Sequence, residues 1–271
     1  MYRGIIMNLK PVIISELNIP PAINAFIGNA PLYDSSCSKQ AKTVFIDMGN
    51  GYFLKIAPKG CLNDEALMTE YLYTKGLSAR VCDYQSDDMD YLITEKIYGE
   101  DGITQKYLDN PKRLTEVFAE CLYRLHSVGF DDCPKQNRIV EMWALMEKLK
   151  SSNTADPWLL EYVEMSDPAL TYRYLTERRE LLKNDALIHG DYCLPNILLK
   201  DFSFSGYIDV GYGGVGDRHY DLFWGVWTLQ YNFHTNDFKD RFLDCYGRGN
   251  VDMERFKLCG ILSALTWDGT E

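Results

Sequence analysis

The segment HGDYCLPN, residues 189–196, carries two unlike oxygen-bearing side chains that a hydrophobic core does not require. Asp191 and Asn196 are five residues apart, and the apolar run ILL follows them directly. A second carboxylate, Asp209 in YIDVG, comes thirteen residues after Asn196. A hairpin that begins near Asn196 and ends near Asp209 would bring the amide and this carboxylate to one end.

These three side chains divide naturally into two chemical tasks. An amide oxygen beside a carboxylate suits Mg²⁺, a hard cation that prefers oxygen ligands and fills its shell with phosphates and water. Asn196 and Asp209 are therefore predicted metal ligands. Asp191, on the loop before the hairpin, is free to accept a proton from an incoming hydroxyl. This division of labour is that of phosphoryl transfer by a kinase.

Phosphoryl transfer also needs a cation for the nucleotide phosphates, and Lys55 is the candidate. In YFLKIA it alternates with Leu54 and Ile56, which face the opposite side of a predicted strand. A lysine in mid-strand that points into a cleft needs a carboxylate or a phosphate. The following helix offers Glu65 and Glu70, which lie on different helix faces because they are five residues apart. We favour Glu65.

The first hundred residues are rich in strand patterns. Residues 42–48 and 51–57 are joined by an Asn-Gly step, which predicts a hairpin. Residues 63–77 have helical spacing, with Asn63 as the expected cap and Gly76 as the end. Residues 79–97 read as two strands around an acidic turn. The Pro20-Pro21 step is expected to break any helix in residues 1–30.

Beyond Gly99 the pattern becomes helical. Apolar periodicity predicts helices at 111–129, 138–152, 167–184, 217–233 and 251–265. Residues 185–190 are a short apolar run, and residues 196–200 with 205–211 form a small hairpin. The expected fold is α+β and bilobal: a β-rich lobe at 1–97, a mainly helical lobe at 98–271, a hinge at 94–97 and a ligand cleft between the lobes.

Composition excludes several classes of protein. Lys and Arg total 28 against 39 Asp and Glu, a formal charge of −11, which disfavours nucleic acid and attracts cations. We find neither an apolar run long enough to span a membrane nor an export signal. Eight cysteines without a C-x-x-C pair fit reduced thiols in the cytoplasm rather than a zinc site.

HGDYCLPNILL, SGYIDVG and GDRHYD closely resemble the aminoglycoside phosphotransferases, and among them the 3′-phosphotransferase (kanamycin kinase) group. AECLYRLHSVGFDDCP, residues 119–134, is similar to that group as well. The resemblance implies a protein-kinase-like fold and Mg²⁺-dependent transfer of a γ-phosphoryl group from ATP or GTP to an aminoglycoside hydroxyl, the 3′-hydroxyl above all, giving antibiotic resistance. Choline, homoserine, methylthioribose and macrolide kinases share H-G-D…N…D, so a metabolic kinase stays open, as does a nucleotide-binding module without transfer activity.

The resemblance also implies roles for individual residues. Asp191 would be the base, Asn196 and Asp209 the Mg²⁺ ligands, and Lys55, held by Glu65, the phosphate contact. Asp217, Arg218 and Asp221 would brace the catalytic loop, and His189 would support it. The nucleotide would also meet the loop at Ser38 and the hinge backbone at Thr94, Glu95, Lys96 and Ile97.

The acceptor in this reading is a polycation, so carboxylates should hold its amines. Near the regions where the resembled group contacts its drugs, this chain offers Asp156, Glu161, Glu164, Asp268 and Glu271. The expected partners are thus an aminoglycoside and a nucleoside triphosphate, with no nucleic acid and no membrane. The expected assembly is a monomer or a weak dimer.

Overall fold

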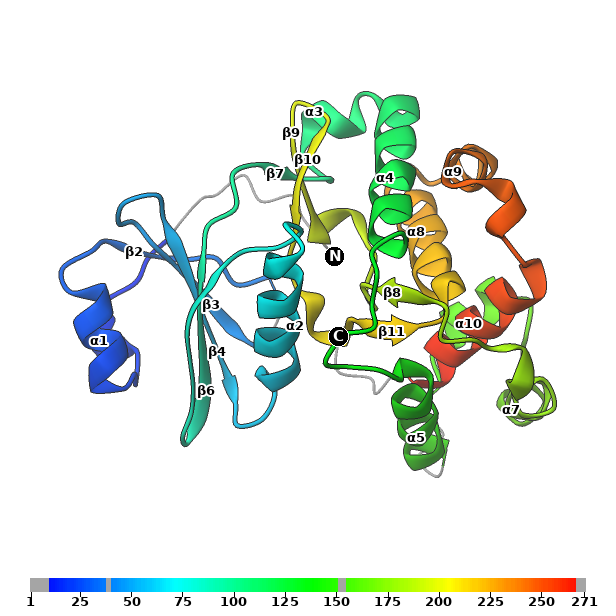
Figure 1. The fold of residues 1–271 in the computed structure, drawn as a ribbon, viewed down its shortest axis with the longest axis horizontal. Coiled ribbons are helices and arrows are strands. Elements are labelled where there is room, and N and C mark those ends of the chain that lie inside the picture. Colours follow the sequence, from blue (N-terminus) through cyan, green and yellow to red (C-terminus); the bar gives the residue numbers. More distant parts are fainter. Residues whose placement is uncertain (1–9, 38–39, 151–154, 267–271) are drawn as a thin grey trace.

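The computed structural model describes residues 10–37, 40–150 and 155–266. Three predicted contact residues, Ser38, Asp268 and Glu271, lie outside these ranges. Figure 1 shows a sheet at one side and a group of helices at the other, with helix α2 (Asn63–Thr74) standing between them. The predicted α+β architecture with two lobes is confirmed.

The first lobe is built on a six-stranded antiparallel sheet in the order β1-β2-β3-β4-β6-β5. Its central strand, β4, carries Lys55, which lies opposite Thr43 of β3 and Leu92 of β6. The predicted hairpin and the predicted strand pair at 79–97 are both present. The strands are β1 (Lys10–Pro11), β2 (Leu32–Asp34), β3 (Lys42–Ile46), β4 (Tyr52–Pro58), β5 (Val81–Ser86) and β6 (Met89–Glu95).

The expectation that Pro20-Pro21 would break any helix near the start is wrong. Helix α1 (Pro21–Ile27) begins at Pro21 itself. Proline is well suited to the first position of a helix, because the N–H that it lacks has no partner there and its fixed φ is already helical. The helix buries Ile23 and Ile27 in the apolar cluster of the sheet.

Helix α2 begins in a different way from the one expected. Asn63 is its first helical residue, not its cap, and Leu62 occupies the cap position without a side-chain cap bond. Instead, the Leu62 N–H donates to the buried carboxylate of Asp90 (2.8 Å). The predicted end is right: Gly76 has a φ of 69° and its N–H donates to the Tyr73 carbonyl (2.9 Å).

The second lobe packs α4, α8 and α10 around one large core. Strands β7, β9 and β10 form a small sheet in the order β10-β9-β7, and β11 pairs with β8. The helix predicted at 167–184 stops at Thr176, and a short 3₁₀ turn follows it. The elements are α3 (Gln105–Leu108), α4 (Pro111–His126), α5 (Arg138–Lys150), α6 (Pro157–Tyr162), α7 (Pro168–Thr176), α8 (Arg218–Phe233), α9 (Lys239–Tyr246), α10 (Met253–Thr266), β7 (Glu100–Asp101), β8 (Ala186–Ile188), β9 (Ile197–Lys200), β10 (Ser203–Tyr207) and β11 (Gly214–Gly216). Within the described ranges, every helix is too short or too polar to cross a membrane.

A substitution of Asp90 tests how the start of α2 is held. It is fully buried and accepts bonds from the Leu62 N–H and the Ser86 hydroxyl (2.6 Å). Asp90→Ala should lower the free energy of unfolding by about 1–3 kcal/mol, because it leaves these buried donors unpaired. Urea unfolding measures the loss, and Asp88→Ala, at an exposed turn position, is the control. A loss no larger than that of the control contradicts this role.

The same variant gives a pH dependence. Burial alone would raise the pKa of the Asp90 carboxyl, but its bonds from Ser86, Gly60 and Leu62 lower it below the ordinary 3.8. A lowered folded-state pKa means that the carboxylate contributes stability above the unfolded-state pKa and loses that contribution as pH falls through the folded-state value. The difference in unfolding free energy between wild type and Asp90→Ala should therefore shrink in strongly acidic buffer.

Candidate active site

One buried carboxylate, that of Asp221, holds the backbone of the loop that carries Asp191. Asp221, on the first turns of α8, accepts the backbone N–H of His189 (2.6 Å) and of Gly190 (2.8 Å). Gly190 has a φ of 82°, and a Cβ there would lie 2.0 Å from the carbonyl oxygen of Tyr212. Only glycine fits this turn. In H-G-D the glycine is therefore required by the backbone conformation, and the aspartate by the chemistry.

His189 holds the loop from the other side. It is fully buried, and its Nε2 lies 3.0 Å from the Ile208 carbonyl oxygen, to which it donates. Nδ1 is then the acceptor for the N–H of Asp191 (3.3 Å). Both ring nitrogens are engaged with backbone, which leaves the imidazole a supporting role.

Asn196 lies against the predicted base. Its Nδ2 donates to Oδ2 of Asp191 (2.7 Å) and to the Asp191 carbonyl (3.0 Å). The Ile208 N–H donates to the Asn196 carbonyl (3.0 Å), so the start of β9 meets the end of β10, and Asp209 follows at once. The hairpin thus brings together Asp191, Asn196 and the segment of Asp209, as the spacing predicted.

Lys55 joins this group from the sheet. Its Nζ lies 2.9 Å from both carboxylate oxygens of Glu65 and 2.6 Å from Oδ1 of Asp209. The structure therefore decides between the two acids of α2: Glu65 pairs with Lys55, while Glu70 is exposed. One ammonium group connects β4, α2 and the turn after β10.

The charges of the cluster follow from burial and pairing. Burial would lower the pKa of Lys55, but Asp209 and Glu65 together raise it above its usual 10.5. Burial would raise the pKa of Asp209, but Lys55 holds it below 3.8. Among the described residues no Lys or Arg forms an ion pair with Asp191, and burial raises the pKa of its carboxyl. The two aspartates therefore differ in charge behaviour. Asp209 stays an anion paired with Lys55, whereas Asp191 takes up a proton more readily.

The donor set fits Mg²⁺. Asn196 uses its amide nitrogen for Asp191, so its amide oxygen is the atom available to a cation, and the carboxylate of Asp209 follows the other strand at the same end of the hairpin. The described ranges contain no group of three or more His, Cys, Asp or Glu that could hold a metal. A site with two protein oxygens suits a hard ion that keeps water and phosphate ligands.

The hinge offers fewer free backbone donors than its length suggests. Thr94 and Glu95 end strand β6, and the Glu95 N–H donates to the Arg80 carbonyl (2.9 Å). The Lys96 N–H donates to the Gly51 carbonyl (3.0 Å). Ile97 packs so closely on Gly206 of β10 that a Cβ there would lie 2.7 Å from its Cδ1. The hinge thus touches the catalytic hairpin directly.

Three of the predicted acceptor contacts, Asp156, Glu161 and Glu164, lie within the described ranges, and all three are on or beside α6. Asp156 caps α6, because its carboxylate accepts the N–H of Trp158 (2.8 Å) and Leu159 (2.9 Å). Glu161 and Glu164 are exposed and line a groove of about 670 Å³ among α6, α8, α9 and α10, whose lining does not include Asp191. Their binding of an acceptor stays a prediction.

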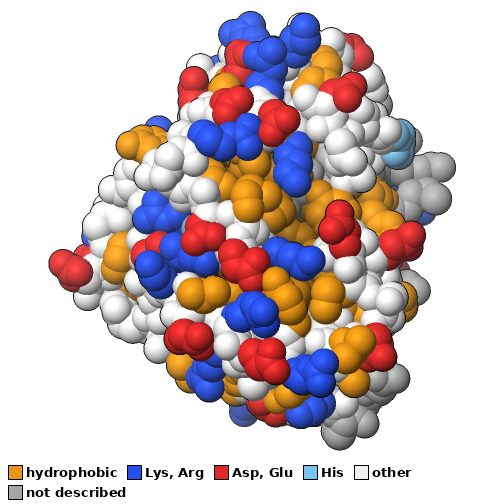
Figure 2. Space-filling model, turned by 90° about the vertical axis from the view of Figure 1, so that its right-hand side faces the viewer, with side chains coloured by type: hydrophobic (Ala, Val, Ile, Leu, Met, Phe, Trp, Pro, Cys, Tyr) orange, Lys and Arg blue, Asp and Glu red, His pale blue; other side chains and the backbone are white. Residues whose placement is uncertain are grey.

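The surface charge on the outer face of the second lobe does not mark a binding site for a polycationic acceptor. Figure 2 shows acidic and basic side chains mixed around apolar patches there. The excess of negative charge is therefore not gathered on this face.

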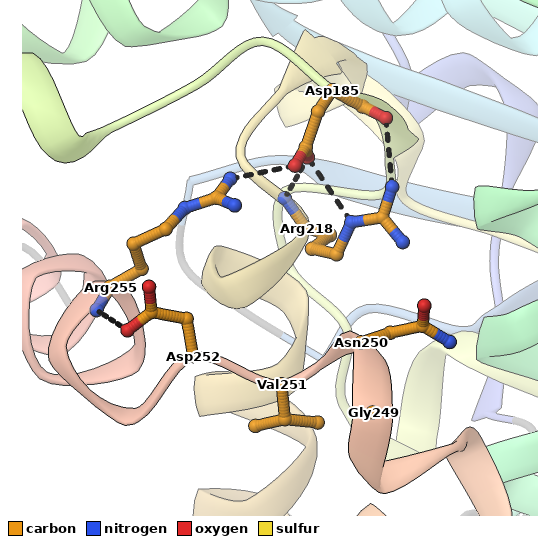
Figure 3. Close-up of a pocket in the computed structure, with 7 residues that line it drawn as sticks. All are labelled: Asp185, Arg218, Gly249, Asn250, Val251, Asp252 and Arg255. Carbon is orange, nitrogen blue, oxygen red and sulfur yellow. Dashed lines mark hydrogen bonds and ion pairs between the residues drawn. The ribbon is translucent and has the colours of Figure 1, made fainter.

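A second pocket, of about 310 Å³, is lined by an ionic network of the second lobe (Figure 3). Asp185 accepts from Arg218 Nε (3.2 Å) and from Arg255 Nη2 (2.8 Å), and Arg255 also contacts Asp217 (2.8 Å). We expected Asp217, Arg218 and Asp221 all to brace the catalytic loop. Asp221 does so, but Asp217 and Arg218 join this separate ionic network between α8 and α10. The sequence analysis did not predict roles for Asp185 and Arg255, because their pairing joins residues 70 positions apart.

Comparison with known proteins decides the family. The sequence profile described as "Phosphotransferase enzyme family" matches residues 39–259, most of the chain. The chain belongs to the phosphotransferase enzyme family. This enzyme is 42% identical over 254 residues to a probable aminoglycoside 3′-phosphotransferase of Lactococcus lactis subsp. lactis (strain IL1403), covering 93% of this chain and 97% of that protein. It is 26% identical over 222 residues to an aminoglycoside 3′-phosphotransferase of Niallia circulans, covering 77% and 81%.

Solved structures share the fold. Aminoglycoside phosphotransferase APH(3″)-Id of Streptomyces rimosus superposes with a TM-score of 0.75 at 22% identity, covering 90% of this chain and 96% of that chain. The same enzyme has been solved with ADP and streptomycin, and that structure matches with a TM-score of 0.73 at 22% identity and the same coverage. The resemblance to aminoglycoside phosphotransferases that the motifs indicated is confirmed, and so is the kinase-like fold.

Asp191→Asn tests the division of tasks in this phosphotransferase. It should lower kcat by about 10²- to 10⁴-fold, the usual contribution of a general base, and leave the nucleotide KM within about twofold. Thermal stability should not fall, because burial disfavours the charged form that the substitution removes. Steady-state kinetics and thermal unfolding measure both effects.

Asp201→Asn is the matched control, because Asp201 is an exposed residue in the turn between β9 and β10. It should leave kcat unchanged. Equal activity of Asp191→Asn and wild type would show that Asp191 takes no proton in the reaction.

Proposed function

We propose that this enzyme transfers the γ-phosphoryl group of a nucleoside triphosphate to a hydroxyl of an aminoglycoside antibiotic, the 3′-hydroxyl being the expected acceptor. The observation that carries the proposal is that two contacting pairs of side chains lie at one end of the same hairpin. Asp191 and Asn196 are in contact at 2.7 Å just before β9, and Lys55 contacts Asp209 at 2.6 Å just after β10, where the Ile208 N–H donates to the Asn196 carbonyl. The relatives that match over most of their length support the choice of acceptor.

The residues perform separate steps. Lys55, with Glu65 behind it, meets the phosphates of the nucleotide. Asn196 and Asp209 would hold Mg²⁺, which when bound neutralises the phosphate oxygens. Asp191 accepts the proton of the acceptor hydroxyl as the bond from that oxygen to the γ-phosphorus forms and the bond to the bridging oxygen breaks. The nucleoside diphosphate leaves with the electron pair of the broken bond.

Asp191 is oriented for this task by its neighbours. The amide of Asn196 donates to Oδ2, and the loop backbone is held by Asp221 and His189. A carboxylate held in this way loses little rotational freedom when the substrate arrives, so positioning costs are met in the free enzyme. The ADP complex of the Streptomyces rimosus enzyme supports an adenine nucleotide as donor, with GTP the alternative.

The acceptor is a polycation, and the formal charge of −11 favours its approach. Glu161, Glu164, Asp268 and Glu271 are the carboxylates proposed to hold its amines, with Asp156 committed to a helix cap. The product gains a phosphate dianion where the drug must meet RNA phosphates, which gives antibiotic resistance. None of the eight cysteines, all within the described ranges, is in a disulfide, which supports a cytoplasmic enzyme, and we propose a monomer or a weak dimer.

Coupled ADP release with purified enzyme tests the proposal. Kanamycin and neomycin should be turned over, and aminoglycosides that lack the 3′-hydroxyl should react at least about 100-fold more slowly, because they offer no oxygen at the reacting position. Choline is the control acceptor and should give no turnover. Turnover of choline without that of any aminoglycoside would indicate a metabolic kinase, and nucleotide binding without turnover of any alcohol would indicate a binding module.

A further inference from the structure

Helix α2 belongs to the first lobe by sequence but not by packing. Met68 and Leu72 are fully buried, and with Tyr71 they are members of the large core of the second lobe. Toward the sheet, the helix contributes Ala66 to a cluster of four buried residues. Figure 1 shows α2 between the sheet and the helices. Its apolar packing therefore ties it more extensively to the second lobe.

Polar bonds fasten the far end of α2 to the loop of residues 129–135, which contains the D-C-P motif. Asp132 accepts from the Tyr71 hydroxyl (3.0 Å) and from Lys75 Nζ (2.7 Å). The Tyr71 hydroxyl also lies 3.3 Å from the Gly129 carbonyl. Lys75 and Tyr71 lower the pKa of the Asp132 carboxyl, so it stays an anion.

The same loop fastens the near end of α2. Lys135 Nζ donates to Asp64 on the first turn (2.8 Å) and is also paired with Glu141 (3.1 Å). The Lys135 carbonyl accepts the N–H of Val215 in β11 (2.7 Å). One loop thus connects both ends of α2 with the segment that follows Asp209.

Glu65 lies between these two attachments. A Cβ on Gly211 would stand 3.3 Å from the Cβ of Glu65, so α2 rests directly on the turn after Asp209. The position of Glu65 therefore depends on the second lobe, as well as on the Leu62–Asp90 bond that holds the start of α2 to the sheet. The Lys55–Glu65 pair thus links the central strand of the sheet to a helix that packs mainly on the second lobe.

We propose that the loop of residues 129–135 is an interlobe clamp, and that Asp132 is a positioning residue for phosphoryl transfer. It acts through Tyr71 and α2 on Glu65, and through Glu65 on Lys55. The catalytic part of this inference rests on the proposed function, but the attachment of α2 does not.

Two pairs of matched variants test the clamp. Asp132→Ala removes the acceptor, and Asp131→Ala removes the same charge from the neighbouring exposed position. Tyr71→Phe removes the bridging hydroxyl, and Tyr73→Phe does so on the exposed face of the same helix. Asp132→Asn keeps an oxygen that can accept from Tyr71 and should restore part of the loss.

The first readout is amide hydrogen exchange of the nucleotide-free enzyme, which needs no acceptor. Asp132→Ala and Tyr71→Phe should speed exchange in residues 63–77 and leave α8 and α10 unchanged. The second readout is kinetic: the nucleotide KM should rise and kcat fall, each by about three- to tenfold, while the acceptor KM stays constant. Both control variants should match wild type.

Three results would overturn the clamp. If exchange in α2 of Asp132→Ala and Tyr71→Phe equals that of the control variants, residues 129–135 do not hold α2. Faster exchange throughout both lobes shows a general loss of stability instead. A changed acceptor KM with an unchanged nucleotide KM shows that Asp132 acts on the other substrate. If no aminoglycoside is turned over but exchange in α2 still rises, the proposed function fails and the attachment of α2 stands.

Discussion

The active site depends on one ammonium group shared by two carboxylates. Lys55 is largely shielded from solvent and contacts Glu65 and Asp209, which come from different elements. A shielded ammonium without carboxylates would be strongly destabilising, so the three elements are held together by the need to pair it. The triphosphate brings further negative charge to the same cation, and the free enzyme already places that cation beside the predicted metal ligand.

A second buried charge supports the first. Asp221 is fully buried and accepts two backbone N–H groups of the catalytic loop, and His126 lies 3.2 Å from it. His126 in turn contacts the Tyr246 hydroxyl (2.8 Å). Buried carboxylates persist where hydrogen bonds replace their water. The helices of the second lobe thereby fix the loop, which leaves Asp191 free for the substrate.

Much of this arrangement could be predicted from the sequence because the spacing is local. A hairpin fixes Asn196 relative to Asp209, and a strand followed by a helix offers Lys55 two nearby acids, Glu65 and Glu70. Long amphipathic helices such as α4 and α8 were predictable from their periodicity. The prediction that Pro20-Pro21 would break any helix near the start was wrong, because a proline is also well suited to the first position of a helix.

Other features could not be predicted, since they depend on contacts distant in sequence. Asp90 replaces a cap on α2 from 28 residues away, and Asp185 meets Arg255 across 70 residues. The attachment of α2 to the second lobe arises in the same way, through Asp132. No short motif reports such pairs, because neither partner has a fixed position relative to the other.

The most direct test of the account is a crystal structure of the enzyme with Mn²⁺ and a non-hydrolysable triphosphate, with the metal located by anomalous scattering. The account predicts a metal peak between Asn196 and Asp209, the triphosphate against Lys55 with its Glu65 contact retained, and Asp191 facing the terminal phosphate. A metal or triphosphate bound away from these four side chains would contradict it.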